Sequence, residues 1–223
     1  MKNLMINLFV SFLIIISTSL YGQKTIKTYY DIYTQNHLEE EYTVNETSAK
    51  NGSYKKFDQN GIILIEGSYL NGKKNGVFKY YQCAPGILLK TITYKNDVKN
   101  GLEESYNCIQ DENGNNISKK NLSITYSNGN WVKEISYFKN GNIEHSLQSN
   151  GICTEYYESG KKKEEYTVTN EVFNGNYTAW FENGNIKIQG MYTNENGKLP
   201  NGKKSGKWVE NNEDGTLKNE TVY

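Results

Sequence analysis

The sequence predicts an all-β protein, an elongated antiparallel meander of repeated β-hairpins preceded by a signal peptide. Three features of the 223 residues indicate this fold: the composition, a repeat of glycines and aromatic residues, and a side-chain alternation of period two. The chain holds 19 Tyr, 20 Gly and only 2 Pro, and is rich in Asn. Tyr and Thr favour strands, whereas Asn and Gly favour tight turns. The hydrophobic share of 36% predicts a thin core, while the 13% of aromatic residues speaks against disorder.

The first segment, residues 1–22, has the layout of a secretory signal peptide. Lys2 precedes an apolar run from Leu8 to Ile16, and small and polar residues follow up to Gly22. Cleavage is expected after Gly22, with Ser19 as a second choice, and a retained N-terminal anchor helix is the alternative. No later apolar segment is long enough to cross a bilayer, so the mature chain is expected to have no transmembrane segment. We therefore expect an exported protein that is periplasmic, associated with the outer envelope, or secreted.

The rest of the chain repeats a pair of glycines. The first glycine of each pair is followed nine or ten residues later by a second one, and in most copies a Tyr comes eight residues after the second. A fixed period of this kind is typical of repeat architectures. The segment from Gly129 to Tyr137 keeps the eight-residue step and is interpreted as a further copy. The pairs are Gly52 and Gly61, Gly76 and Gly86, Gly151 and Gly160, Gly175 and Gly184, and Gly206 and Gly215.

Within each copy the side chains alternate, which predicts strands with two different faces. Asn-Gly dipeptides at 60–61, 128–129, 140–141 and 183–184 are strong hairpin signals, because both residues accept positive φ. A single hairpin is marginal in water, so the copies must stack side by side to bury their aromatic face. Residues 23–50 are expected to form a degenerate capping repeat and residues 51–223 the hairpin repeats. An irregular stretch at about 103–150 is a kink, a binding insert or a decayed part of the repeat.

Several stretches resemble the MORN-repeat variant of bacterial envelope proteins, often catalogued as YwqK-like antitoxin-type repeat proteins. The resemblance is best in GSYKKFDQNGIILIEGSYLNGKKNG (52–76) and GNYTAWFENGNIKIQGMY (175–192), and YYDIYTQNHLEEEYTV (29–44) is similar to the opening of many such chains. It implies a hairpin-repeat fold, no catalytic residues, and a docking or scaffold role. The antitoxin label implies a toxin partner, which fits poorly with an export signal.

The residues that carry chemistry are few, and we predict no enzyme, no cofactor and no metal site. Every basic residue is Lys and the net charge is zero, which argues against nucleic-acid binding. His37 and His145 have no partners at metal-ligand spacing, and acid–base catalysis has no evident second group. Both histidines are interpreted as partly buried or solvated residues.

The sequence leaves open whether two of the three cysteines form a disulfide. Cys83 and Cys108 each lie seven residues after a glycine, in equivalent places of adjacent copies. Equivalent positions one hairpin apart are separated by about 9.5 Å, whereas a disulfide needs Cα atoms within about 7 Å. A bridge between them would therefore need a distorted loop near Pro85 or at 107–116. Cys153 stands where other copies have an aromatic residue and is expected to be a buried apolar filler.

Aromatic residues at fixed repeat positions are the one candidate binding face. They are interpreted either as the core of a thin sheet or as a docking face that is partly exposed, with Trp180 expected to point outward. The leading functional hypothesis is a non-enzymatic scaffold or interaction module of the cell envelope with an unknown protein partner. The alternatives are a glycan-binding protein that uses exposed Tyr and Trp, and an antitoxin-like protein that binds its partner. The residues of this aromatic seam are Tyr54, Tyr69, Phe78, Tyr94, Tyr177, Trp180, Tyr192 and Trp208.

Overall fold

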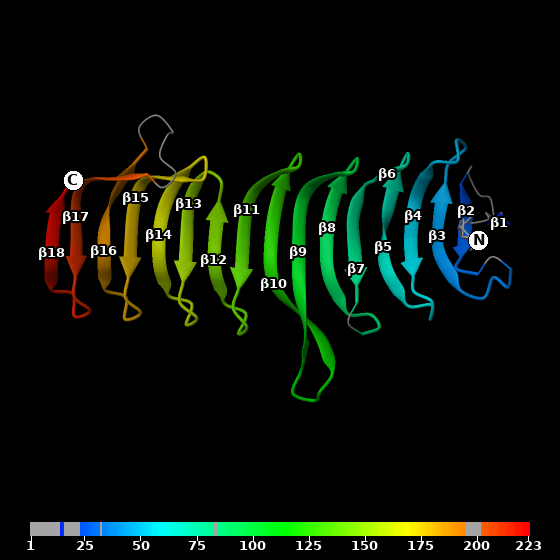
Figure 1. Cartoon of the computed structure of the whole chain (residues 1–223), viewed down its shortest axis with the longest axis horizontal. Helices are drawn as coiled ribbons and strands as arrows, with labels where there is room; N and C mark the ends of the chain where they lie inside the picture. The colour runs from blue at the N-terminus through cyan, green and yellow to red at the C-terminus, as the bar shows by residue number, and fades with distance from the viewer. Residues whose placement is uncertain (1–13, 16–22, 32, 83, 195–201) are drawn as a thin grey trace, which may run out of the picture. The chain divides into compact units, whose positions relative to one another are not determined.

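The computed structural model describes residues 14–15, 23–31, 33–82, 84–194 and 202–223, and Figure 1 traces its strands. Apart from Ile14 and Ile15, the predicted signal peptide lies outside these residues. The chain divides into two compact units, Met1–Lys99 with Cys108–Ser118, and Asn100–Asn107 with Lys119–Tyr223. No helix occurs among the described residues, and none there is long and apolar enough to cross a bilayer.

In the first unit, strands that follow one another in the sequence pair antiparallel. The strand β1 pairs with β2, and β5 pairs with both β6 and β7. The strands are β1 (Ile14–Ile15), β2 (Lys24–Tyr29), β3 (Leu38–Val44), β4 (Lys50–Phe57), β5 (Ile63–Leu70), β6 (Lys73–Lys74), β7 (Gly76–Tyr81) and β8 (Leu88–Lys95).

The second unit repeats the same antiparallel order from β10 to β18. The all-β meander of repeated hairpins is thus confirmed. Two strands, β9 (Val98–Gln110) and β10 (Asn116–Ser127), have residues in both units. The strands that lie wholly in the second unit are β11 (Asn130–Tyr137), β12 (Ile143–Gln148), β13 (Gly151–Tyr156), β14 (Lys162–Thr169), β15 (Val172–Trp180), β16 (Ile186–Thr193), β17 (Lys203–Asn211) and β18 (Leu217–Val222).

The irregular stretch at 103–150 consists of strands and turns. Its irregularity comes from one long hairpin, since β9 has 13 residues and β10 has 12. The hairpin ends in a turn in which the Asp111 N–H donates to the Asn115 carbonyl at 2.9 Å. This region is therefore a lengthened copy of the same hairpin unit.

Two kinds of turn recur between the described strands. Some hairpins close with two residues that both have positive φ, such as Asn71 (49°) with Gly72 (81°) and Asn128 (48°) with Gly129 (85°). This is the two-residue turn whose twist matches the strands. Gly129, which keeps the eight-residue step to Tyr137, therefore closes a different kind of turn from Gly61, and spacing alone does not separate the two.

Several of the other turns place a single glycine three residues after the start of the turn. In the Gly184 turn, the Gly184 N–H donates to the Phe181 carbonyl at 2.9 Å and the Phe181 N–H donates to the Asn185 carbonyl at 2.9 Å. Neighbouring turns are linked by amide side chains, since Asn183 and Asn185 both donate to the Glu213 carbonyl at 2.8 Å. These links hold successive hairpins in one register.

Each unit carries its aromatic residues on one face of its sheet. In the first unit Tyr42 lies opposite Tyr54, and Tyr54 lies opposite Gly67. The buried core consists of residues on this face, among them Tyr54, Phe78 and, in the second unit, Trp208. We call it the aromatic face and the opposite one the polar face.

Two glycines make room for the largest rings. A Cβ atom on Gly67 would lie 2.7 Å from the Phe78 ring, and one on Gly190 would lie 2.2 Å from the Trp208 ring. Each ring therefore packs directly onto the backbone of the neighbouring strand. Close packing of this kind leaves no space for a methyl group.

Replacing Gly190 by Ala should lower the free energy of unfolding by about 1–3 kcal/mol, because the new methyl group displaces the Trp208 ring. Urea unfolding measures this change. The matched control is Gln189→Ala on the polar face, which should stay within about 0.5 kcal/mol of the wild type. Equal unfolding midpoints for Gly190→Ala and the wild type would contradict the close packing.

Candidate functional site

The aromatic seam forms one continuous ladder of rings in each unit. In the first unit the ring centroids of Tyr54 and Tyr69 are 5.3 Å apart, those of Tyr69 and Phe78 5.4 Å, and those of Phe78 and Tyr94 5.5 Å. All three pairs meet edge to face, an arrangement that stabilises aromatic pairs by about 0.5–1.5 kcal/mol beyond their burial.

The second unit repeats this ladder with more rings. The Tyr192 ring lies 5.1 Å from Phe173, 5.8 Å from Tyr177 and 5.1 Å from Trp208. Phe173 also contacts Tyr166 at 4.7 Å, and Trp208 contacts Tyr223 at 6.4 Å. The seam residues of each unit therefore pack against one another.

Lysine side chains cover these ladders. The Lys50 ammonium lies 4.2 Å from the ring centroid of Tyr42, 4.5 Å from Tyr54 and 5.4 Å from Tyr69. A cation over an aromatic face is attracted by the negative face of the ring, and the aliphatic stem of Lys shields apolar surface. The Lys50 side chain thus covers the rings of Tyr42, Tyr54 and Tyr69.

The same lysine recurs four residues before the central ring of other copies. Lys74 lies 5.1 Å from Phe78 and 5.0 Å from Tyr94, and Lys204 lies 4.3 Å from Trp208 and 5.3 Å from Tyr223. We call Lys50, Lys74 and Lys204 the capping lysines.

Where a copy lacks this lysine, an aromatic residue can replace it. In the copy centred on Tyr177 the equivalent position holds Phe173, which packs into the ladder itself.

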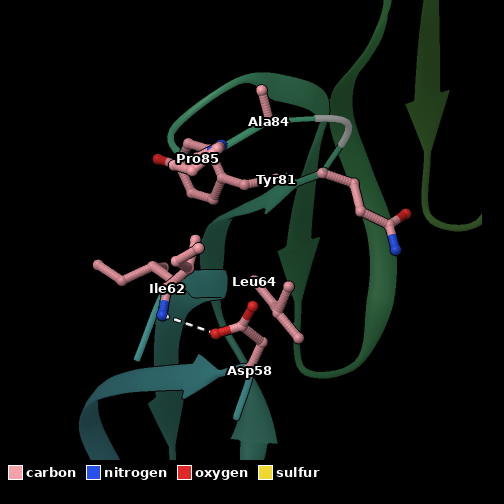
Figure 2. A pocket seen from close by; sticks show the side chains of 8 residues that line it. Asp58, Ile62, Leu64, Tyr81, Ala84 and Pro85 are labelled. Atoms are coloured by element: carbon pink, nitrogen blue, oxygen red, sulfur yellow. Dashed lines mark hydrogen bonds between the residues drawn. The ribbon is translucent and has the colours of Figure 1, made fainter. Parts of the chain in front are cut away.

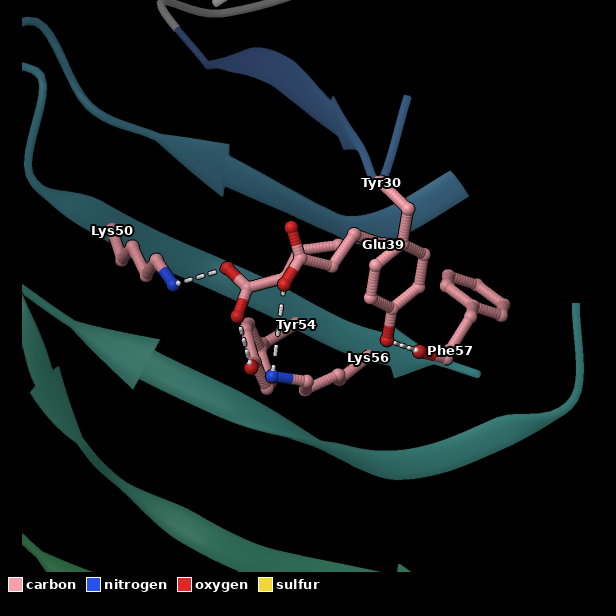
Figure 3. A network of polar contacts seen from close by, with 7 residues as sticks. Tyr30, Glu39, Lys50, Tyr54, Lys56 and Phe57 are labelled. Carbon is pink, nitrogen blue, oxygen red and sulfur yellow. Dashed lines mark hydrogen bonds and ion pairs between the residues drawn. The ribbon is translucent and has the colours of Figure 1, made fainter. Parts of the chain in front are cut away.

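A network of carboxylates and hydroxyl groups anchors the first ladder, as Figure 3 shows. The Glu40 carboxylate accepts from the Lys50 ammonium at 3.1 Å and from the Tyr54 hydroxyl at 2.8 Å. Burial, together with this carboxylate, raises the pKa of Tyr54 well above its usual value. The second unit repeats the contact, because the Tyr177 hydroxyl donates to Glu164 at 3.0 Å.

The residues of the seam differ in burial. Tyr54, Phe78 and Trp208 are only 7%, 1% and 4% exposed, whereas Tyr69, Tyr94, Tyr177 and Tyr192 are half-buried. Trp180 is half-buried too, lies under the Lys162 ammonium at 5.6 Å and makes no ring contact with the seam among the described residues. In both units the rings meet lysines or one another rather than an open surface.

Sequence reasoning missed the capping lysines and the ring of Phe173. The signal is present in the sequence as a Lys, an Asn or Ser, a glycine, any residue and then an aromatic residue, as in Lys50 to Tyr54, Lys74 to Phe78 and Lys204 to Trp208. Spacing alone does not show that the lysine lies over the ring. The positive φ of the glycine, +106° at Gly52, turns the strand at this point.

The pairing of β11 with β12 gives His145 partners that the sequence did not indicate. Its Nε2 lies 3.1 Å from the Glu134 carboxylate and its Nδ1 lies 2.9 Å from the Ser136 hydroxyl. That hydroxyl donates to the Glu144 carboxylate at 3.0 Å. Both ring nitrogens of His145 thus lie within hydrogen-bonding distance of side chains from the adjacent strand.

Of the cysteines, Cys153 is a free, buried thiol, as expected for an apolar filler. Burial raises its pKa, which makes the reactive thiolate scarce. Cys108 is disulfide-bonded. Cys83, the partner considered from the sequence, lies outside the described residues.

Hollows lie on the described surface of both units. One, of about 210 Å³, lies in the first unit between the 58–62 turn and the loop at 84–85 and is drawn in Figure 2. Its one carboxylate, Asp58, accepts the N–H groups of Asn60 and Ile62 at 2.8 Å, and these bonds lower its pKa. The carboxylate therefore holds a turn and is not a free acid or base.

The second hollow is a groove of about 610 Å³ on the polar face of the second unit, over β15, β16 and β17. Amide, hydroxyl and ammonium groups line it beside Met191, which is exposed. The lining side chains on this face are Asn176, Thr178, Gln189, Met191, Lys207 and Val209.

The polar face also exposes apolar side chains at one fixed repeat position. Val77, Leu102 and Ile152 each follow a glycine of positive φ and are 49%, 43% and 53% exposed. Each precedes a buried residue of the opposite face, because successive strand residues point to opposite sides.

Within the described ranges, no group of three or more His, Cys, Asp or Glu side chains is arranged to hold a metal ion. No family model matches the chain, and no curated protein matches it.

Shortening Lys50 should destabilise the protein by exposing the rings beneath it. We expect Lys50→Ala to lower the free energy of unfolding by about 1–2 kcal/mol. Lys50→Met should lower it less, because the apolar stem still covers Tyr54. Urea unfolding of the wild type, Lys50→Ala and Lys50→Met measures the order of their stabilities. An unchanged stability of Lys50→Ala would contradict a capping role.

Buried tyrosines should make the fold sensitive to alkali. Burial, with the Glu66 hydrogen bond, raises the pKa of Tyr81 to about 12 from the usual 10.0, and burial raises that of Tyr166 to about 12. Because the folded pKa is the higher one, this stabilisation is complete below pH 10 and is lost as the pH rises towards 12. Urea unfolding across this range should show the loss, and Tyr81→Phe, which cannot ionise there, should lose less. The same pH dependence in both proteins would contradict the assignment to Tyr81.

Proposed function

We propose that this chain is an exported, non-enzymatic repeat protein that acts as an interaction or scaffold module of the cell envelope. It binds a protein partner through the polar face of its sheet. Export rests on the signal-peptide layout of residues 1–22. The absence of an enzyme activity is part of the proposal, supported by the contacts of His145 and Asp58 with groups of their own sheet and turn.

The contrast between the two faces carries this proposal. The aromatic face is covered by the chain's own lysines, whereas the polar face exposes Val77, Leu102 and Ile152 at one repeat position. Recurring apolar groups surrounded by polar ones are typical of surfaces that bind another protein. Sugar binding on aromatic side chains depends on open ring faces, whereas Tyr54, Phe78 and Trp208 of the seam are buried and lie under lysines.

We further propose that the chain is related to the MORN-repeat variant of bacterial envelope proteins. The two stretches with the best resemblance, 52–76 and 175–192, each contain one hairpin with the same single-glycine turn, at Gly61 and Gly184. A docking or scaffold role is what that resemblance implies.

Affinity capture tests the proposed face. A tagged chain starting at Gln23 is used to capture partners from envelope and culture-supernatant fractions of the source organism. We expect one stoichiometric partner that is lost when Val77 and Ile152 are both changed to Asn, since buried apolar contacts dominate binding. The matched control is Ser53→Asn, at the equivalent position of a copy that is already polar.

Retention of the partner by the Val77→Asn, Ile152→Asn variant would contradict the proposed face. Loss of the partner in a Trp180→Ala variant alone would point to the rim of the aromatic face instead. Retention of polysaccharide without any protein would replace the proposal by glycan binding.

A further inference from the structure

The polar face of the first unit carries a ladder of alternating charges. The strand register places Lys27 opposite Glu41, Glu41 opposite Lys55, Lys55 opposite Glu66, and Glu66 opposite Lys79. The five residues come from five strands, β2, β3, β4, β5 and β7. Adjacent strands lie about 4.8 Å apart, so the sign of the charge changes at every strand. We call this row the charge ladder.

The fold itself does not require these charges. In the second unit the equivalent row passes through Thr154, Glu165, Thr178, Gln189 and Val209, and the same sheet forms. Thr178 follows Tyr177 as Lys55 follows Tyr54, and Gln189 precedes Gly190 as Glu66 precedes Gly67. The regular alternation is thus a property of the first unit's surface rather than of the hairpin repeat.

The ladder is accessible and only partly neutralised within the chain. Side chains of its ion pairs are 29–47% exposed, with Lys27 at 3.1 Å from Glu41 and Lys79 at 2.9 Å from Glu66. Lys55, at the centre, makes no direct ion pair among the described residues.

A row of mostly small side chains flanks the ladder on one side. This row consists mostly of hydroxyl residues, and Val77 is its exposed apolar member. The row contains Thr25, Thr43, Ser53, Ser68, Val77 and Thr93.

Because the sign changes at every strand, the ladder is complementary to a reversed copy of itself that is shifted by one strand. We propose that this face of the first unit binds the same face of a second copy of the chain. A two-fold axis parallel to the strands, midway between β3 and β4, places Lys55 opposite Glu41 of the second copy and Lys27 opposite its Glu66. Each contact occurs twice, which gives four pairs of opposite charge. The inference rests on the proposed use of the polar face and specifies an occupant for it.

The area of the face suits a weak interface. The four strand positions that this axis opposes, β2 to β5, at about 4.8 Å and with strands of about 20–27 Å give about 450 Å² per copy. Stable interfaces bury about 800 Å² per partner, and weak, transient ones bury less. Opposed sheets pack about 10 Å apart, and the hydroxyl row leaves room for that approach. Val77 supplies an apolar contact beside the charges.

A charge exchange tests the inference directly. One variant carries Glu41→Lys and Glu66→Lys, and its ladder is all positive; the other carries Lys27→Glu, Lys55→Glu and Lys79→Glu, and its ladder is all negative. We expect the wild type to dimerise and each variant to bind itself at least about tenfold more weakly, because like charges then meet across the interface. An equimolar mixture should form the heterodimer. Sedimentation equilibrium of the full chain measures each association constant.

Salt and two controls complete the experiment. Screening should weaken the wild-type dimer as salt rises from about 0.1 M to about 1 M, where the Debye length falls from about 10 Å to about 3 Å. Exchanging Lys207 and Glu220, an ion pair on the second unit's polar face at 2.7 Å, should leave dimerisation unchanged. Circular dichroism checks folding. If a charge variant does not fold, Glu41→Gln with Glu66→Gln, which copies the amide of Gln189, replaces it and should also weaken the dimer.

A wild type that stays monomeric up to about 1 mM, with a mixture that also stays monomeric, would overturn the inference. A dimer that neither charge variant weakens would overturn it as well, since its interface lies elsewhere. In both cases the capture experiment with Val77→Asn and Ile152→Asn still decides whether the polar face binds a different protein. Failure of the self-association and failure of the proposed function are therefore distinguishable.

Discussion

The contact between lysine and aromatic ring is the interaction on which the rest of each unit depends. A sheet without a second layer has no opposing side chains to cover its apolar face. Here the Lys50 ammonium lies over three tyrosine rings and is held by Glu40, while Lys74 and Lys204 cover Phe78 and Trp208. The lysine stems act as the missing layer. This explains how a chain with a 36% hydrophobic share nevertheless buries Phe78 to 1% exposure.

Once the aromatic face is closed in this way, the two faces of the sheet serve different purposes. Strand alternation separates them residue by residue, so that Phe78 lies in the core while Val77 and Lys79 lie on the polar face. Substitutions on the polar face are therefore compatible with the core. The contrast between Lys55 in the first unit and Thr178 in the second illustrates this freedom.

The turns and the strand faces were predictable because they depend on local chemistry. Asn-Gly at 128–129 and 183–184 closes hairpins, and Cys153 is buried as its repeat position predicts. The turn class of Gly129 was not predictable from spacing, since both turn types use Asn-Gly. The partners of His145 were also missed. They come from β11, and the register that brings Glu134 and Ser136 to the ring depends on a bulge beside Tyr137.

By itself, the sequence determined the hairpin repeat, because a period-two pattern and left-handed turn residues act within a few residues of each other. Only the tertiary structure decided what each aromatic residue does. Whether a ring is a core residue or an open contact depends on which side chain lies over it, and Lys50, Phe173 and Trp208 meet their partners across strands. The charge ladder is likewise invisible along the chain. Lys27 and Lys79 are 52 residues apart, and only strand pairing places them in one row.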